Sequence, residues 1–177
     1  ITTPTSLTLP IGARVINVQT AQQMLEAVLK ECAQADALIM AAAVADFRPK
    51  QAARNKLKKQ DGIPQIELEA TEDILEAVSA QKSRKLALST VEAKRPRITV
   101  GFAAESRDLL ENASEKLRSK HLDFIAANDI SAQDAGFNVE TNRVTLLFAD
   151  GKKESLPLMN KTEVAEAILE HVAALLE

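Results

Sequence analysis

Three short apolar segments, separated by stretches with helical spacing, constrain the fold of this chain more than any other feature. They are residues 37–42 (ALIMAA), 98–102 (ITVGF) and 124–127 (FIAA). The first shows no polar–apolar alternation, which is typical of a strand covered on both faces in a parallel sheet. Such strands alternating with helices predict an α/β fold, a Rossmann-like three-layer sandwich with a mostly parallel sheet.

Helix signals lie beside these strands. Thr20 stands three residues before Gln23, the spacing of a capping box, and Thr71 is a candidate N-cap for another helix. A further helix is expected after residue 102. Apolar residues at helical spacing give the expected inward faces: Met24, Leu25, Val28, Leu29 and Cys32; Ile74, Leu75 and Val78; Leu109, Leu110, Ala113 and Leu117.

The remaining elements extend the pattern at both ends of the chain. Residues 14–18 are predicted as a short strand that completes a β-α-β unit with 37–42. Near the other end, 144–148 alternates, Asp150-Gly151 marks a turn and 154–158 returns, which predicts a β-hairpin added at a sheet edge. Asn160 and Glu163 then open a last amphipathic helix.

Length and charge exclude several classes of protein. The 177 residues suit one domain with a real core, and the net charge of −3 argues against general nucleic-acid binding. No apolar run approaches the ~20 residues needed to cross a bilayer. Cys32 is the only cysteine, so no internal disulfide can form, which fits a cytoplasmic protein.

A cationic loop follows the first of these strands. Residues 47–62 contain Pro, Asn, Gly and several lysines and are predicted as a long polar loop, from which 66–69 returns as a strand. The lysines Lys56, Lys58 and Lys59 could fold over a polyphosphate, or they could form a solvated surface. The sequence pattern leaves both interpretations open.

Distinctive residues also lie where strands are expected to end. Asp46 could accept hydrogen bonds from a ligand or cap a turn, and ligands of open α/β sheets bind beyond the carboxyl ends of the strands. Lys116 and Lys120 share a helix face, where their repulsion would favour an anionic ligand, although Glu111 and Glu115 could instead neutralise them. Residues 71–73 could present free N–H groups, but two acids there disfavour a bare anion.

Other chemistries lack their usual patterns. His121 and His171 show no metal-ligand spacing, no residue is predicted as a metal ligand, and no Ser-His-Asp or Cys-His arrangement stands out. No G-x-G-x-x-G sequence is present, which argues against a nicotinamide dehydrogenase, and no P-loop is present either.

Taken in order, a set of segments resembles the phosphopantothenoylcysteine synthetase family, the bacterial CTP-dependent phosphopantothenate–cysteine ligases. The segments are AAAVADFRP, KLKK, TEDIL, GFAAES, EKLRSKHLDFIAAND and NRVTLLFADGKKESLPLMNKTEVAEAIL. The resemblance covers nearly the whole chain. It implies a single domain over residues 1–177 that activates the carboxylate of 4'-phosphopantothenate with CTP and joins it to L-cysteine through an acyl-cytidylate.

The resemblance also assigns roles to residues. Lys56 would be the catalytic lysine of a flap that closes over the phosphates. Phe102 would pack near the base or ribose. The expected nucleotide contacts are Met40, Ala41, Ala42, Asp46, Lys56, Glu72, Asp73, Ile74, Leu75, Phe102, Lys116 and Lys120. The family further implies Mg²⁺ as cofactor, CTP as co-substrate and a homodimer. It also implies a fused or associated phosphopantothenoylcysteine decarboxylase, to which any FMN would belong.

The chain departs from the family pattern in two places. Thr71-Glu72-Asp73 stands where the family usually has Asn-Pro-Asp, and the first strand, glycine-rich turn and Asn-bearing loop of the family are expected to be missing before Ile1. Two rival hypotheses follow: a non-catalytic nucleotide-binding fragment, and a Rossmann-like reductase, against which the absent glycine fingerprint argues.

Overall fold

The computed structural model describes residues 1–51, 55–81, 96–105, 107–131 and 139–177. The chain divides into two compact units. The first unit contains Ile1–Val28 and Ala43–Ile74, and the second contains Leu29–Ala42 and Leu75–Glu177. The single domain predicted over residues 1–177 remains a prediction.

The second unit is built on a five-stranded sheet of order β1-β4-β5-β7-β8. Parallel pairing joins β1 (Ala37–Met40) to β4 (Ile98–Glu105) and β4 to β5 (Phe124–Asp129). The hairpin of β7 (Val144–Phe148) and β8 (Lys153–Ser155) adds two antiparallel strands at one edge. The predicted α/β fold with a mostly parallel sheet and an added antiparallel hairpin is therefore confirmed, with the parallel pairing in the strands β1, β4 and β5.

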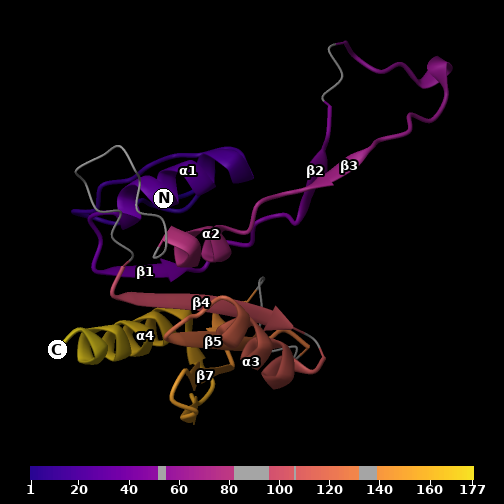
Figure 1. The fold of residues 1–177 in the computed structure, drawn as a ribbon. Coiled ribbons are helices and arrows are strands. Elements are labelled where there is room, and N and C mark those ends of the chain that lie inside the picture. The colour runs from indigo at the N-terminus through magenta and orange to yellow at the C-terminus, as the bar shows by residue number, and fades with distance from the viewer. Residues whose placement is uncertain (52–54, 82–95, 106, 132–138) are drawn as a thin grey trace. The chain divides into compact units, whose positions relative to one another are not determined.

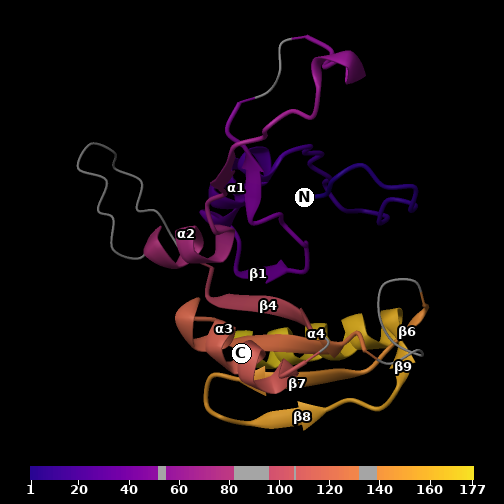
Figure 2. The same cartoon turned by 90° about the vertical axis from the view of Figure 1, so that its right-hand side faces the viewer.

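Helices cover both faces of this sheet (Figure 2). On one face α4 (Lys161–Leu176) packs on alternate residues of the central strands. On the other face lie α3 (Leu109–Ser119) and the residues of α2 (Ile74–Ala80) that belong to this unit. The core on the α4 side consists of Ile98, Val100, Phe124, Ala126, Val144, Leu146, Phe148, Val164, Ile168 and Val172.

Side-chain caps fix the starts of two helices. At α4 the Asn160 side chain accepts from the Glu163 N–H at 2.9 Å, and the Glu163 carboxylate accepts from the Asn160 N–H at 2.8 Å. This is the predicted capping box. A small pair of strands, β6 (Thr141–Asn142) and β9 (Met159–Asn160), fixes the entry to the helix. At α1 (Ala21–Cys32), the Gln23 side chain and the Thr20 hydroxyl form the same reciprocal bonds, each 3.2 Å long.

The first unit also contains a two-stranded antiparallel ribbon, β2 (Phe47–Pro49) and β3 (Leu68–Ala70), shown in Figure 1. Beyond the ribbon the chain carries a short 3₁₀ turn, η1 (Lys59–Asp61). The prediction of a loop from residue 47 was wrong at its start, because cross-strand bonds to β3 order Phe47–Pro49. Compared with the strand predicted at 66–69, β3 begins two residues later and ends one residue later.

Three further expectations need correction. Residues 14–18 form only an isolated parallel bridge, Thr2↔Asn17, because no second strand bonds are made there. The strand predicted over 37–42 ends at Met40. Leu110 is 42% exposed, because α3 turns Ala113 and Leu117 inward instead.

The cap predicted at Thr71 was also wrong. α2 begins only at Ile74, and the Thr71 hydroxyl donates to the carbonyl of Ala45. Within the described ranges, no helix is both long enough and apolar enough to cross a membrane.

A contact between the hairpin and α4 leads to a prediction about the pH dependence of stability. Glu154 on β8 accepts from Lys152 at 3.0 Å and contacts His171 of α4 at 3.4 Å. The bond from Lys152, assisted by His171, holds the pKa of Glu154 below its ordinary value of 4.5. A lowered folded-state pKa contributes stability above the ordinary value, and this contribution is lost as the pH falls through the folded-state pKa.

We therefore expect Glu154→Gln to lower the free energy of unfolding by about 0.5 kcal/mol near neutral pH, since the group is partly solvated. The difference between variant and wild type should vanish well below pH 4.5. Urea denaturation at both pH values measures it. Glu166→Gln, an exposed change on α4, is the matched control, and an equal loss in both variants would contradict the role of the contact.

Candidate functional site

The predicted nucleotide contacts divide between the two units. Asp46, Lys56 and the stretch Glu72–Ile74 belong to the first unit. The second unit holds Met40, Ala41, Ala42, Leu75, Phe102, Lys116 and Lys120. Each group is described by itself.

In the second unit, Met40 to Ala42 lie at the carboxyl end of β1. Met40 is buried opposite Gly101 of β4, and Ala41 and Ala42 are exposed after the strand. Because β1, β4 and β5 run parallel, their carboxyl ends lie at one sheet edge, which is where open α/β sheets bind ligands. Methyl side chains there leave the backbone accessible to a ligand.

Phe102 and Lys116 are joined at the middle of β4. The Lys116 ammonium donates to the Phe102 carbonyl at 2.9 Å in a partly buried position. The Phe102 ring is itself half-buried against the core on the α4 side of the sheet. The acceptor that holds Lys116 is neutral, so this contact does not neutralise the positive charge of the lysine.

Lys120 has a charged partner. Its ammonium lies 3.1 Å from the carboxylate of Glu76 on α2, and the lysine side chain is 22% exposed. The neighbouring Leu75 is buried near Gly101, where an added Cβ would lie 3.7 Å from Leu75 and 2.6 Å from Leu122. Glycine at this position therefore allows the Leu122 side chain to approach β4 closely, whereas the Leu75 contact would be an ordinary one.

Asn128, near the end of β5, lies at a strand end that the sequence marks as distinctive, but it is not among the predicted nucleotide contacts. Its side-chain oxygen is buried and has no hydrogen-bond partner among the described residues. A buried acceptor without a donor is costly, so it is a candidate to accept a hydrogen bond from a ligand. The sequence signal was its position at the end of a buried strand, since ligands of parallel sheets bind at that edge.

The residues beside Asn128 have local tasks. The Asp129 carboxylate accepts from both the hydroxyl and the N–H of Ser131, at 2.6 and 2.9 Å, and these bonds lower its pKa.

On α1, burial raises the pKa of Cys32 to about 11, with Glu31 adding to the shift. Cys32 is therefore a thiol at neutral pH and is unsuited to act as a nucleophile.

In the first unit, Asp46 lies at the base of the ribbon. The Thr71 N–H donates to the Asp46 carbonyl at 2.8 Å, and the Thr71 hydroxyl donates to Ala45 at 2.5 Å. These bonds hold the backbone of Asp46 while its carboxylate stays exposed. Glu72 and Asp73 are exposed as well, whereas Ile74 is buried.

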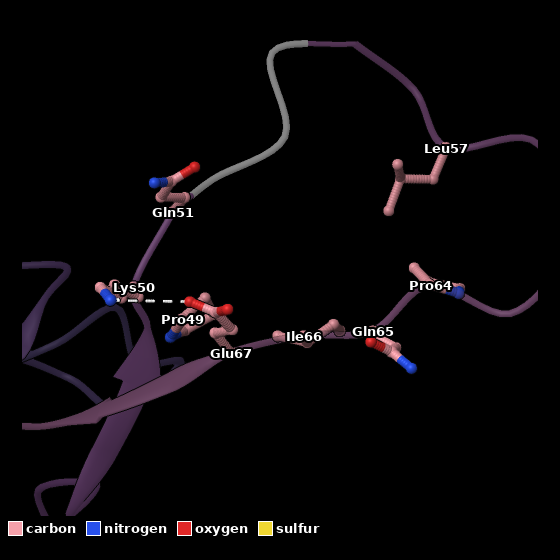
Figure 3. Close-up of a pocket in the computed structure, with 8 residues that line it drawn as sticks. All are labelled: Pro49, Lys50, Gln51, Leu57, Pro64, Gln65, Ile66 and Glu67. Carbon is pink, nitrogen blue, oxygen red and sulfur yellow. Dashed lines mark ion pairs between the residues drawn. The ribbon is translucent and has the colours of Figure 1, made fainter.

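Lys56 lies between the two ribbon strands, in the segment of residues 47–70 that we call the flap. Its side chain is exposed, next to Leu57. Leu57 and seven further flap residues line an open hollow of about 620 Å³. Figure 3 shows Leu57 and Pro64 on one side of it and the Lys50–Glu67 ion pair, 3.6 Å long, on the other.

Comparison with known proteins identifies the family. Residues 1–176 match the DFP family, described as the DNA/pantothenate metabolism flavoprotein C-terminal domain. The chain belongs to this family. The family resemblance found in the sequence is thereby confirmed.

Two similar relatives are bifunctional proteins by name. The coenzyme A biosynthesis bifunctional protein CoaBC of Bacillus subtilis (strain 168) is 46% identical over 173 residues, which are 97% of this chain and 40% of that protein. The chain thus spans less than half of the relative's length. CoaBC of Vibrio vulnificus (strain CMCP6) is 38% identical, with 98% of this chain and 41% of that protein covered.

A solved structure shares the fold. The crystal structure of the C-terminal domain of CoaBC superposes with a TM-score of 0.75 at 35% identity, over 98% of this chain and 71% of that one.

Proposed function

We propose that this chain is a ligase domain that joins 4'-phosphopantothenate to L-cysteine in coenzyme A biosynthesis, with CTP as co-substrate. The observation that carries the proposal is the family match over residues 1–176, with CoaBC proteins as the curated relatives. The CTP dependence rests on the sequence resemblance.

The proposed reaction has two steps. A carboxylate oxygen of phosphopantothenate attacks the α-phosphorus of CTP, and the bond to the β-phosphate oxygen breaks, so that pyrophosphate leaves. The amine of cysteine then attacks the acyl carbon of the acyl-cytidylate. An amide forms, the amine loses a proton, and CMP leaves. The first step brings two anions together, so cationic side chains that neutralise phosphate charge lower its barrier.

The lysines of this chain supply such charge. Lys116, fixed by the Phe102 carbonyl, is preorganised to contact a polyphosphate, and Lys120 lies one helical turn further along. We assign Lys56 of the flap to the charge that develops on the phosphates during the first step. Ala41, Ala42 and Asn128 provide backbone and amide groups for the nucleoside or substrate.

The sequence resemblance implies Mg²⁺ as a cofactor. No group of three or more His, Cys, Asp or Glu side chains within the described residues could hold a metal ion. Mg²⁺ commonly binds through few carboxylates and through substrate phosphates. We propose that Mg²⁺ binds together with CTP, through its phosphates.

A homodimer is part of the proposal, and the ribbon supports it. In its antiparallel register, Arg48 pairs with Glu69 on one face, while Phe47 and Leu68 lie on the other, 62% and 60% exposed. Two-stranded ribbons are marginal in water, and an exposed apolar face favours association.

We also propose a cytoplasmic location and a fused or associated flavin-dependent decarboxylase that would hold the FMN.

The proposal is tested by nucleotide release. The purified chain is incubated with CTP, Mg²⁺ and 4'-phosphopantothenate, with and without L-cysteine, and CMP is measured. CMP release that requires cysteine supports a ligase. CTP binding without such release would select the non-catalytic nucleotide-binding fragment, and tight NADPH binding would favour the reductase.

Lys56→Gln should slow acyl-cytidylate formation by about 10²–10³-fold while changing CTP affinity much less, because the charge it opposes develops during reaction. Single-turnover pyrophosphate release and calorimetry separate the two effects. Lys58→Gln, two residues along the same segment, is the control. Equal losses in both variants would show that only the overall charge of the segment matters.

Lys116→Ala and Lys120→Ala should each weaken CTP binding more than CMP binding, since we place both ammonium groups beside the polyphosphate. A loss of about ten-fold for CTP is expected for a charge-assisted contact. Calorimetric titration of both nucleotides measures it. If CTP and CMP lose affinity equally, the lysines do not face the polyphosphate.

A further inference from the structure

The two lysines near the end of α3 are held by chemically different acceptors. Lys116 donates to a neutral backbone carbonyl at 2.9 Å, and Lys120 is paired with a carboxylate at 3.1 Å. Lys116, Lys120, Phe102 and Glu76 all belong to the second unit. The two ammonium groups therefore present unequal charge to an incoming anion.

We propose that Glu76 is an internal counter-ion of Lys120 that weakens polyphosphate binding at this position. The proposal rests on the proposed function, because it takes Lys120 as a polyphosphate contact. Glu76 becomes an affinity-setting residue for the triphosphate substrate and for the pyrophosphate that leaves. It does not touch the reacting atoms.

The exposure of the Lys120–Glu76 pair explains why Glu76 can give up a hydrogen bond from the Lys120 ammonium. The Lys120 side chain is 22% exposed, whereas that of Glu76 is 69% exposed. A largely solvated carboxylate is little stabilised by its partner, so it can release one ammonium donor to a phosphate at small cost. The same carboxylate repels the arriving anion. Both effects reduce polyphosphate affinity, and both disappear when the charge of Glu76 is removed.

A reduced affinity has a use in this reaction. Pyrophosphate is a highly charged product that would stay bound to two uncompensated lysines. Because the Glu76 carboxylate can pair with Lys120 again, it favours the release of pyrophosphate. CMP lacks the β- and γ-phosphates, so its affinity should be insensitive to Glu76.

The test is a double-mutant cycle read by calorimetry with CTP, pyrophosphate and CMP as separate probes. Glu76→Gln should tighten CTP and pyrophosphate binding about two- to five-fold, the range expected of a partly exposed pair, and leave CMP binding unchanged. In the Lys120→Ala background the same change should give no gain. Glu166→Gln on α4 removes one negative charge elsewhere on the second unit and should change nothing.

The outcomes separate this proposal from the proposed function. CTP affinity that is unchanged or weaker in Glu76→Gln overturns the counter-ion role, while CTP binding by the wild type leaves the proposed function standing. A gain that persists in the Lys120→Ala background overturns it too, because the effect would then be one of general charge. No binding of CTP or pyrophosphate by the wild type overturns both proposals.

Discussion

Parallel pairing of β4 with β1 on one side and β5 on the other is the constraint on which the second unit depends. It commits three strands to run in one direction and so collects their carboxyl ends at one edge. Both faces of such a sheet must be covered, which explains the near-continuous apolar sequence of these strands. The helices that cover them, α3 and α4, also carry charged residues beside the sheet.

The cost of that burial appears in its polar groups. Thr99, near the start of β4, donates its N–H to the Asp123 carboxylate at 2.7 Å, which ties the start of β5 to its neighbour. Asn128 keeps a buried oxygen without a partner in the described part of the chain. A buried polar group without a partner is costly, and a ligand at the sheet edge would satisfy the Asn128 oxygen.

Local patterns predicted those elements whose residues interact with near neighbours in sequence. The capping boxes at Thr20 and Asn160 were confirmed because both partners of each bond lie within one helical turn. The hairpin at β7–β8 was confirmed for the same reason. Residues 14–18 look like a strand from composition alone, but the backbone pairing described there is a single parallel bridge, Thr2↔Asn17. The start of the ribbon was missed because Arg48 pairs with Glu69, which is distant in sequence, so no local pattern indicates the strand.

The sequence by itself determined the fold class and the family, because strand burial, helix period and ordered motifs are properties of short segments. It also predicted which lysines share a helix face. Only the tertiary structure decided what those lysines touch: a backbone carbonyl for Lys116 and the Glu76 carboxylate for Lys120. These partners come from other elements, up to 44 residues away in the chain, and only packing of α2 and α3 on one sheet brings them within bonding distance.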